Sequence, residues 1–136
     1  MLTQLSYIDL IKAIQDKIES KTKLKCYDFV QDDANSPFYY AEVVSTRPAK
    51  SKTMYKSAYT VFIHTIAEEN ESSVPIYRYV QLLEEALSED IELEDPFQLL
   101  LQVNNGLQTI KTDETGEKHA VHSFVFTVCH GFKCKV

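Results

Sequence analysis

Apolar residues recur at spacings of three and four in two parts of the chain, which indicates two amphipathic helices. The first is expected at residues 4–20 and the second at residues 73–88. Pro75 suits the first turn of the second helix, with Ser72 or Ser73 as its N-cap. Each helix also has a polar face, so each must cover an apolar surface. The apolar positions are Leu5, Ile8, Leu10, Ile11, Ile14 and Ile18, followed by Ile76, Tyr79, Val80, Leu83 and Leu87.

Five other segments alternate between apolar and polar residues or are rich in aromatic and β-branched ones, which is typical of strands. In the third of these, both faces are partly apolar beyond Tyr59, so either both faces are covered or one meets a partner chain. Asn105-Gly106 indicates a turn or bulge inside the fourth. The strands are expected at residues 25–30, 38–45, 53–67, 97–113 and 119–132.

The connectors between these elements favour hairpins. Residues 31–37 form a polar turn, and residues 113–118 form a hairpin turn that contains Gly116. Residues 46–52 are expected to be a loop, because Pro48 cannot donate a hydrogen bond to a sheet and basic residues surround it. The predicted fold is therefore α+β, in the order α-β-β-β-α-β-β. It has a mostly antiparallel sheet of about five strands, with both helices packed on one face and a single domain over residues 1–136.

Composition narrows the possible functions. Apolar residues make up 44% of the chain and the net charge is −6, which argues against a general nucleic-acid or membrane binder, since both of those partners are anionic. No apolar run approaches the roughly 20 residues that span a bilayer. The first residues do not resemble a signal peptide, so a cytoplasmic location is the default expectation.

The sequence offers little reactive chemistry. Three glycines cannot build a phosphate-binding loop. Cys129, His130 and Cys134 lack the second close pair of ligands that a structural zinc site needs, and with Cys26 the three cysteines are expected to be reduced thiols. His64 lies in an apolar strand and is expected to have a hydrogen-bonded structural role. We therefore expect no catalytic site, no metal and no cofactor.

Charges are unevenly distributed along the chain. Residues 45–58 contain four bases and no acid, a net charge of +4. Residues 68–95 contain ten acids and one base, a net charge of −9. A molecule with a positive and a negative flank can join head to tail with its own copies, and such contacts close into a ring when the rotation permits. An acidic channel through such a ring would let DNA pass without binding it.

The order of these features resembles the tail-completion proteins of long-tailed bacteriophages, which include tail-terminator and tail-to-head joining proteins. The resemblance is carried by IDLIKAIQDKI followed by Cys26-Tyr27-Asp28, by Ser36-Pro37-Phe38-Tyr39-Tyr40, by the long strand SAYTVFIHTIA, by YVQLLEEAL and by DETGEKHAVHSFVFTV. It covers nearly the whole chain. The sequence departs from the family pattern at Tyr40-Ala41-Glu42-Val43-Val44 and in the long acidic stretch 89–95.

The resemblance implies a structural, non-enzymatic virion protein. Such proteins form a ring, usually of six subunits, at the head-proximal end of the tail tube, and they are often monomeric before they meet it. The implied partners are its own copies, the major tail tube protein and the head connector or stopper protein, with DNA passing through the ring and no membrane contact. The implied subunit contacts are Arg47, Lys50, Lys52, Tyr55 and Lys56 on one copy, and on the next Glu68, Glu69 and Glu71, or the second helix with Glu84 and Glu85.

Two other classes of function remain open from the sequence. A small-ligand or protein-binding α+β module unrelated to phage would show a pocket lined by several of Tyr39, Tyr40, Tyr55 and Tyr59. An enzyme with a site assembled from scattered residues would show a cleft that joins His64 to an acid with a strongly shifted pKa.

Overall fold

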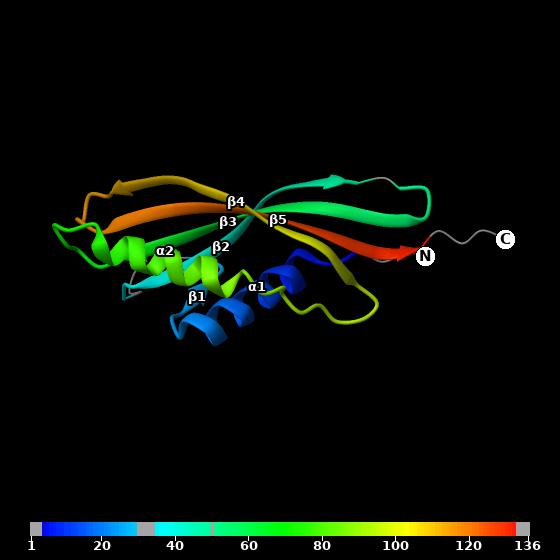
Figure 1. Ribbon diagram of the computed structural model, residues 1–136, viewed down its shortest axis with the longest axis horizontal. Coiled ribbons are helices and arrows are strands. Elements are labelled where there is room, and N and C mark those ends of the chain that lie inside the picture. The colour runs from blue at the N-terminus through cyan, green and yellow to red at the C-terminus, as the bar shows by residue number, and fades with distance from the viewer. Residues whose placement is uncertain (1–3, 30–34, 50, 133–136) are drawn as a thin grey trace.

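The computed structural model describes residues 4–29, 35–49 and 51–132, and in this part of the chain it has two helices and five strands (Figure 1). The predicted order α-β-β-β-α-β-β is confirmed. The elements are α1 (Tyr7–Thr22), β1 (Cys26–Tyr27), β2 (Phe38–Pro48), β3 (Met54–Ala67), α2 (Val74–Ala86), β4 (Gln98–Thr112) and β5 (Lys118–Phe132). Neither helix is long and apolar enough to cross a membrane.

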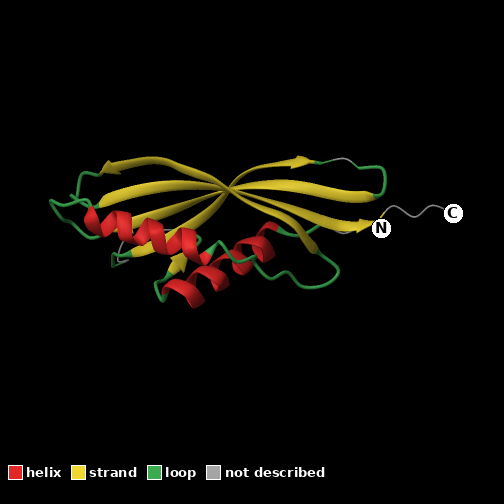
Figure 2. Cartoon of the chain, in the orientation of Figure 1, coloured by secondary structure: helices red, strands yellow, loops and turns green. Residues whose placement is uncertain are grey.

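The five strands form one sheet in the order β1-β2-β3-β5-β4. Only the short β1 runs parallel to its neighbour, and the other pairs are antiparallel. Both helices lie on the same side of this long, twisted sheet, and no described helix covers its other face (Figure 2). The predicted α+β class and the packing of both helices on one face are confirmed.

Capping groups set the limits of both helices. In α1, the Ser6 Oγ accepts a hydrogen bond from the Asp9 N–H at 3.1 Å, and the helix ends at Lys23, whose φ is +64°. In α2, Ser73 occupies the N-cap position without a side-chain capping bond. The Ser72 Oγ instead accepts from the Val74 N–H at 3.1 Å. Both helices therefore begin within three residues of the predicted starts.

The main core lies between the helices and the sheet. The helices contribute Leu10, Ile14 and Ile18 from α1 and Leu83 from α2, and all four are fully buried. The sheet contributes Tyr39, Ala41, Tyr59, Val61, Ile63, Phe124, Phe126 and Val128. Burial of large apolar side chains supplies most of the free energy of folding, so this layer fixes how the helices sit on the sheet.

The second strand is longer than predicted. The loop expected at residues 46–52 is wrong for residues 46–48, because β2 continues to Pro48 opposite Ser57. The Ala49 N–H donates to the Lys56 carbonyl at 2.9 Å, so the nitrogen of the preceding residue, Pro48, points away from β3 toward the open edge of the sheet. Proline fits an edge strand in this orientation, because no hydrogen bond to β3 is lost.

The first strand is shorter than predicted. Of the described residues 25–29, only Cys26 and Tyr27 pair with β2, opposite Tyr39 and Tyr40. Val30, the end of the predicted strand, lies outside the described residues. The outer edge of β2 beyond Tyr40 therefore has no partner strand among the described residues.

Gly106 and Gly116 lie in the kinds of local structure that the sequence predicted for them. The pairing of β4 with β5 shifts register between Asn104 and Gly106, and Gly106 has a φ of +97°, so the predicted bulge is confirmed. Gly116 has a φ of +87° in the turn between β4 and β5. The Asp113 carboxylate organises this turn by accepting from the Thr115 and Glu117 N–H groups at 3.0 and 3.1 Å.

Candidate functional site

The basic residues predicted for the subunit contact lie at one end of the molecule, on and beside the hairpin that joins β2 to β3 (Figure 1). Arg47 and Lys52 are exposed, Tyr55 is 45% exposed and Lys56 is half-buried. Lys50 belongs to the same connection and lies outside the described residues. The described part of this end therefore presents two exposed bases to solvent.

The predicted acidic residues follow the other end of β3. Glu68 is half-buried, and its carboxylate accepts a hydrogen bond from the Tyr79 hydroxyl at 3.1 Å, so it serves the attachment of α2 to the sheet. Glu69 is exposed, with its side chain beside Gly116 in the β4–β5 turn. Glu71 is exposed as well. Glu69 and Glu71 are thus the two acids of this group that face solvent.

The basic and the acidic ends cannot meet within one copy. They are joined by β3, which runs for 14 residues from Met54 to Ala67. An extended strand rises about 3.3 Å per residue, so the two ends lie about 40 Å apart. A contact between the two ends would therefore have to join two molecules.

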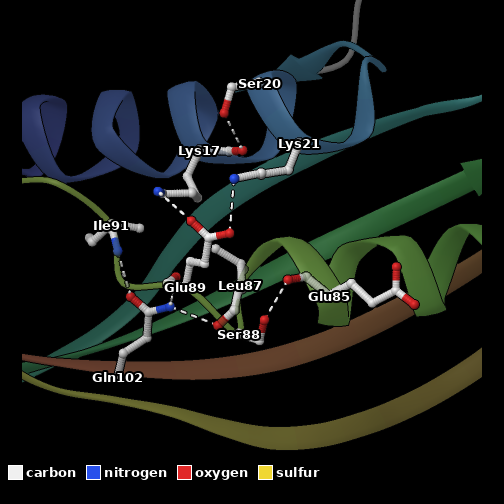
Figure 3. A network of polar contacts seen from close by, with 9 residues as sticks. All are labelled: Lys17, Ser20, Lys21, Glu85, Leu87, Ser88, Glu89, Ile91 and Gln102. Atoms are coloured by element: carbon white, nitrogen blue, oxygen red, sulfur yellow. Dashed lines mark hydrogen bonds and ion pairs between the residues drawn. The ribbon is translucent and has the colours of Figure 1, made fainter.

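Part of the acidic segment is neutralised inside the chain. The Glu89 carboxylate forms ion pairs with Lys21 at 2.8 Å and with Lys17 at 3.6 Å, both on α1 (Figure 3). The hydrogen bond from Lys21 is the largest influence on Glu89 and holds the pKa of its carboxyl below the usual range. The net charge of residues 68–95 consequently overstates the negative charge that a partner would meet.

A glutamine side chain holds the same connector against β4. The Gln102 amide nitrogen donates to the carbonyls of Leu87 and Glu89, each at 2.8 Å, and its oxygen accepts from the Ile91 N–H at 2.9 Å (Figure 3). Three hydrogen bonds from one side chain satisfy the backbone of a segment that has no helix or strand of its own.

The acids at the end of α2 lie beside β4. The Glu84 carboxylate accepts from the Asn104 amide at 3.3 Å and lies 3.6 Å from the His122 Nε2. Glu85 is exposed and accepts a weak hydrogen bond from Gln81 at 3.4 Å. This pair is the alternative acidic surface expected from the sequence, and it lies nearer to the middle of the sheet than Glu71 does.

His64 has the hydrogen-bonded environment that its sequence context predicted. Its Nε2 lies 2.7 Å from the Glu42 carboxylate and its Nδ1 lies 2.7 Å from the His119 Nε2. The Tyr40 ring stacks on the imidazole at a centroid distance of 4.1 Å. Burial, followed by the neighbouring His64, lowers the pKa of His119. Both ring nitrogens of His64 are engaged by side chains, so the pair with Glu42 does not offer a base to a substrate.

Other reactive side chains are dispersed. Among the described residues there is no group of three or more His, Cys, Asp and Glu side chains that could hold a metal ion. Cys26 and Cys129 are free and buried. Burial is the main cause that raises the pKa of the Cys26 thiol to about 12, which keeps it protonated and unreactive near neutral pH.

A groove of about 1000 Å³, which the sequence patterns did not predict, runs between α1 and the outer edge of β2. The four tyrosines named for a ligand pocket do not line this groove; Tyr7 and Tyr27 do. Ile8, placed on the buried face of the first helix from its spacing, is 80% exposed on the wall of the groove. The fully buried stripe of α1 is Leu10, Ile14 and Ile18, at spacings of four, and at 100° per residue Ile8 falls outside that stripe.

These features define a small α+β protein whose surfaces suit contacts with other proteins, with exposed charged ends and an open sheet edge. The whole chain, residues 1–136, matches the model of a family described as "Putative tail termination protein". The chain belongs to this phage tail terminator family, and it is a structural protein of a phage tail. The resemblance seen in the sequence is thereby confirmed.

A solved structure shows the same fold. A chain of the "Virion of native gene transfer agent (GTA) particle" superposes with a TM-score of 0.73 at 15% identity, over 91% of this chain and 99% of that chain. At this identity the likeness concerns the fold. A search of curated proteins gave no match.

Proposed function

We propose that this protein forms a ring at the head-proximal end of a long phage tail tube and stops the growth of the tube there. The family to which the chain belongs is the main support, because it is described by tail termination. The proposed neighbours are copies of the same chain, the major tail tube protein below and the head connector or stopper protein above. The ring, of six subunits by the family pattern, lets DNA pass without binding it and assembles in the host cytoplasm.

The protein acts in this proposal through shape and charge, with no reaction catalysed. Support comes from the environment of His64, whose two ring nitrogens are both engaged, and from buried, protonated Cys26. The described residues bring no set of metal ligands together. The net charge of −6 favours passage of DNA through the ring over its capture.

The proposed contact between copies joins the basic hairpin of one to an acidic surface of the next. The basic side consists of Arg47, Lys50, Lys52 and Lys56, with Tyr55 beside them. The acidic side is either Glu68, Glu69 and Glu71 or the pair Glu84 and Glu85. For the first of these acidic surfaces, the distance of about 40 Å between the ends of β3 supports a contact between copies, since the basic hairpin cannot reach the acidic end of its own copy.

Charge reversal tests this contact. The double variant Arg47→Glu and Lys52→Glu should keep its thermal unfolding midpoint, because both side chains are exposed, and should enter tails at least tenfold less often. Adding Glu69→Lys and Glu71→Lys, or instead Glu84→Lys and Glu85→Lys, should restore incorporation for the surface that is the true partner. Quantitative blotting of purified tails measures the result. Normal incorporation of the first double variant would refute the proposed charge pairing.

A further inference from the structure

Among the described residues, the outer edge of β2 beyond Tyr40 has backbone groups without a strand partner. The Tyr39 N–H donates to the Lys25 carbonyl at 2.8 Å, so alternate residues from Tyr39 onward turn their backbone groups away from β3. The short β1 pairs only with Tyr39 and Tyr40. Val43 continues this outward series, and no described strand pairs with it on that side. Its N–H and C=O are therefore aimed at the groove.

Beyond the bulge in β2, alternate residues again turn their backbone groups away from β3. The register with β3 shifts between Val43 and Ser45. Because the Ala49 N–H points inward to Lys56, Thr46 and Pro48 point outward. Thr46 keeps its N–H and Pro48 has none. The edge thus offers a short stretch of hydrogen-bonding groups that ends at a proline, a common device for limiting pairing at a sheet edge.

Apolar side chains flank this edge. Tyr7 and Ile8 on α1 are 55% and 80% exposed, Phe29 is 59% exposed and Val44 is 42% exposed, and all four line the groove. A strand added beside β2 would lie under α1 and cover these side chains. Main-chain hydrogen bonds and apolar contacts together are the usual basis for adding a strand to a sheet edge.

The other open edge of the sheet is β4. Leu101 and Leu107 on this strand are 57% and 43% exposed. Its pairing with β5 shifts register three times, so only short stretches are regular, among them Thr109 to Thr112.

Between Gln98 and Thr112 the single charged residue is Lys111. The groove beside β2 has two lysines, Lys12 and Lys25, and four acids, namely Asp16, Glu19, Asp28 and Glu42. A strand with one base and no acid complements that excess of negative charge.

We propose that β4 of a second copy of this chain occupies the groove beside β2 and extends the sheet from one copy into the next. This inference rests on the proposed ring. The sheet order places β2 and β4 on opposite sides of the molecule, as a head-to-tail contact requires. Within one copy β4 runs antiparallel to β2, so copies that share one orientation along the strands bring the two edges together as an antiparallel pair.

This arrangement also selects between the two acidic surfaces. Glu84 is bonded to Asn104, which lies on β4 opposite Phe124, so it sits on the flank that would face the next copy's β2. Glu71 lies at the far end of β3 from the basic hairpin. Rescue of the basic charge reversal is therefore expected from Glu84→Lys and Glu85→Lys, and not from Glu69→Lys and Glu71→Lys.

Cross-linking in assembled tails tests the edge contact. In a Cys134→Ser background, the double variant Val44→Cys and Asn105→Cys, at the two bulges that lie at the same level across the sheet, should give a ladder from dimers up to the complete ring when treated with a short bismaleimide. Each single variant should stay monomeric on denaturing gels. A dimer from Val44→Cys alone would mean that two β2 edges pair with each other, and no ladder from the double variant would mean that the edges do not meet. Either result overturns the proposal.

A backbone variant gives an independent check. Thr46→Pro removes one outward N–H, and the matched control Thr46→Ala removes only the side chain. We expect the proline variant to keep its unfolding midpoint and to occupy tails about tenfold less than the alanine variant. Equal occupancy would contradict the edge contact. If the cross-link fails in tails that still end at normal length, this inference is rejected and the proposed termination role is left intact. If tails made without the protein have normal length, the termination role itself is rejected.

Discussion

At the scale of single residues, buried histidines and thiols are structural groups of this fold. His130 is 3% exposed, and its Nδ1 accepts a hydrogen bond from the Leu5 N–H at 3.2 Å, which requires the unprotonated ring nitrogen. Burial lowers the pKa of His130. It also lowers the pKa of His122, with Glu84 as a smaller opposing influence. Residue type and local sequence predicted a structural role for His64, but the partners of these histidines come from segments distant in the sequence.

The lowered pKa of His130 predicts acid-sensitive stability. The unfolded chain takes up a proton near pH 6.5 and the folded chain only at lower pH, so the contribution of the neutral ring is complete above about pH 6.5 and is lost as the pH falls below it. Urea unfolding should give a lower free energy at pH 5 than at pH 7.5. The variant His130→Leu should be less stable at pH 7.5 and should show a weaker pH dependence. An unchanged pH dependence in His130→Leu would contradict this assignment.

The thiol of Cys26 should react very slowly with thiol reagents in the folded protein. Its raised pKa, about 12, and its 2% exposure leave almost no accessible thiolate at pH 8. In a Cys134→Ser background, a disulfide reagent should modify Cys26 at least a hundredfold more slowly in native protein than in urea. Fast labelling of native protein, with Cys26→Ser abolishing it, would show that the thiol is open to solvent.

At the scale of elements, the periodicity of apolar residues predicted most helices and strands correctly, but it did not predict how far the edge strand β2 extends. Helical spacing and strand alternation predicted both helices and all five strands. Both helices, β2, β3 and β5 bury apolar residues in the core, whereas β4 has only exposed and half-buried residues. The end of β2 was missed, because a proline is compatible with a strand only when its nitrogen faces an open edge. The ion pairs of Glu89 with α1 were missed as well, since no local pattern relates residues so far apart in sequence.

Gln102 should anchor the connector between α2 and β4. Its side chain makes three hydrogen bonds to the backbone of that segment, so Gln102→Ala should lower the free energy of unfolding by about 2 kcal/mol. The control Gln108→Ala, on the same strand and exposed, should change it by less than about 0.5 kcal/mol. Urea unfolding measures both. Equal effects of the two substitutions would show that the network does not stabilise the connector.

At the scale of the whole molecule, the chain is elongated, with exposed bases at one end, exposed acids at the other and open strands along both long sides (Figure 1). The charged ends were visible in the sequence as two segments of opposite sign. The open edges were not, because which strands lie at the borders of a sheet depends on the strand order. Surfaces of this kind suit contacts with other virion proteins, which a protein of a phage tail must make.

The most direct test of the central claim is the distribution of tail lengths, measured by electron microscopy, in particles made without this protein. A ring that stops tube growth predicts tubes well beyond the normal length that lack heads, and normal lengths when the intact gene is supplied in trans. Tails of normal length, whether joined to heads or separate from them, would contradict the claim that this protein ends the tube.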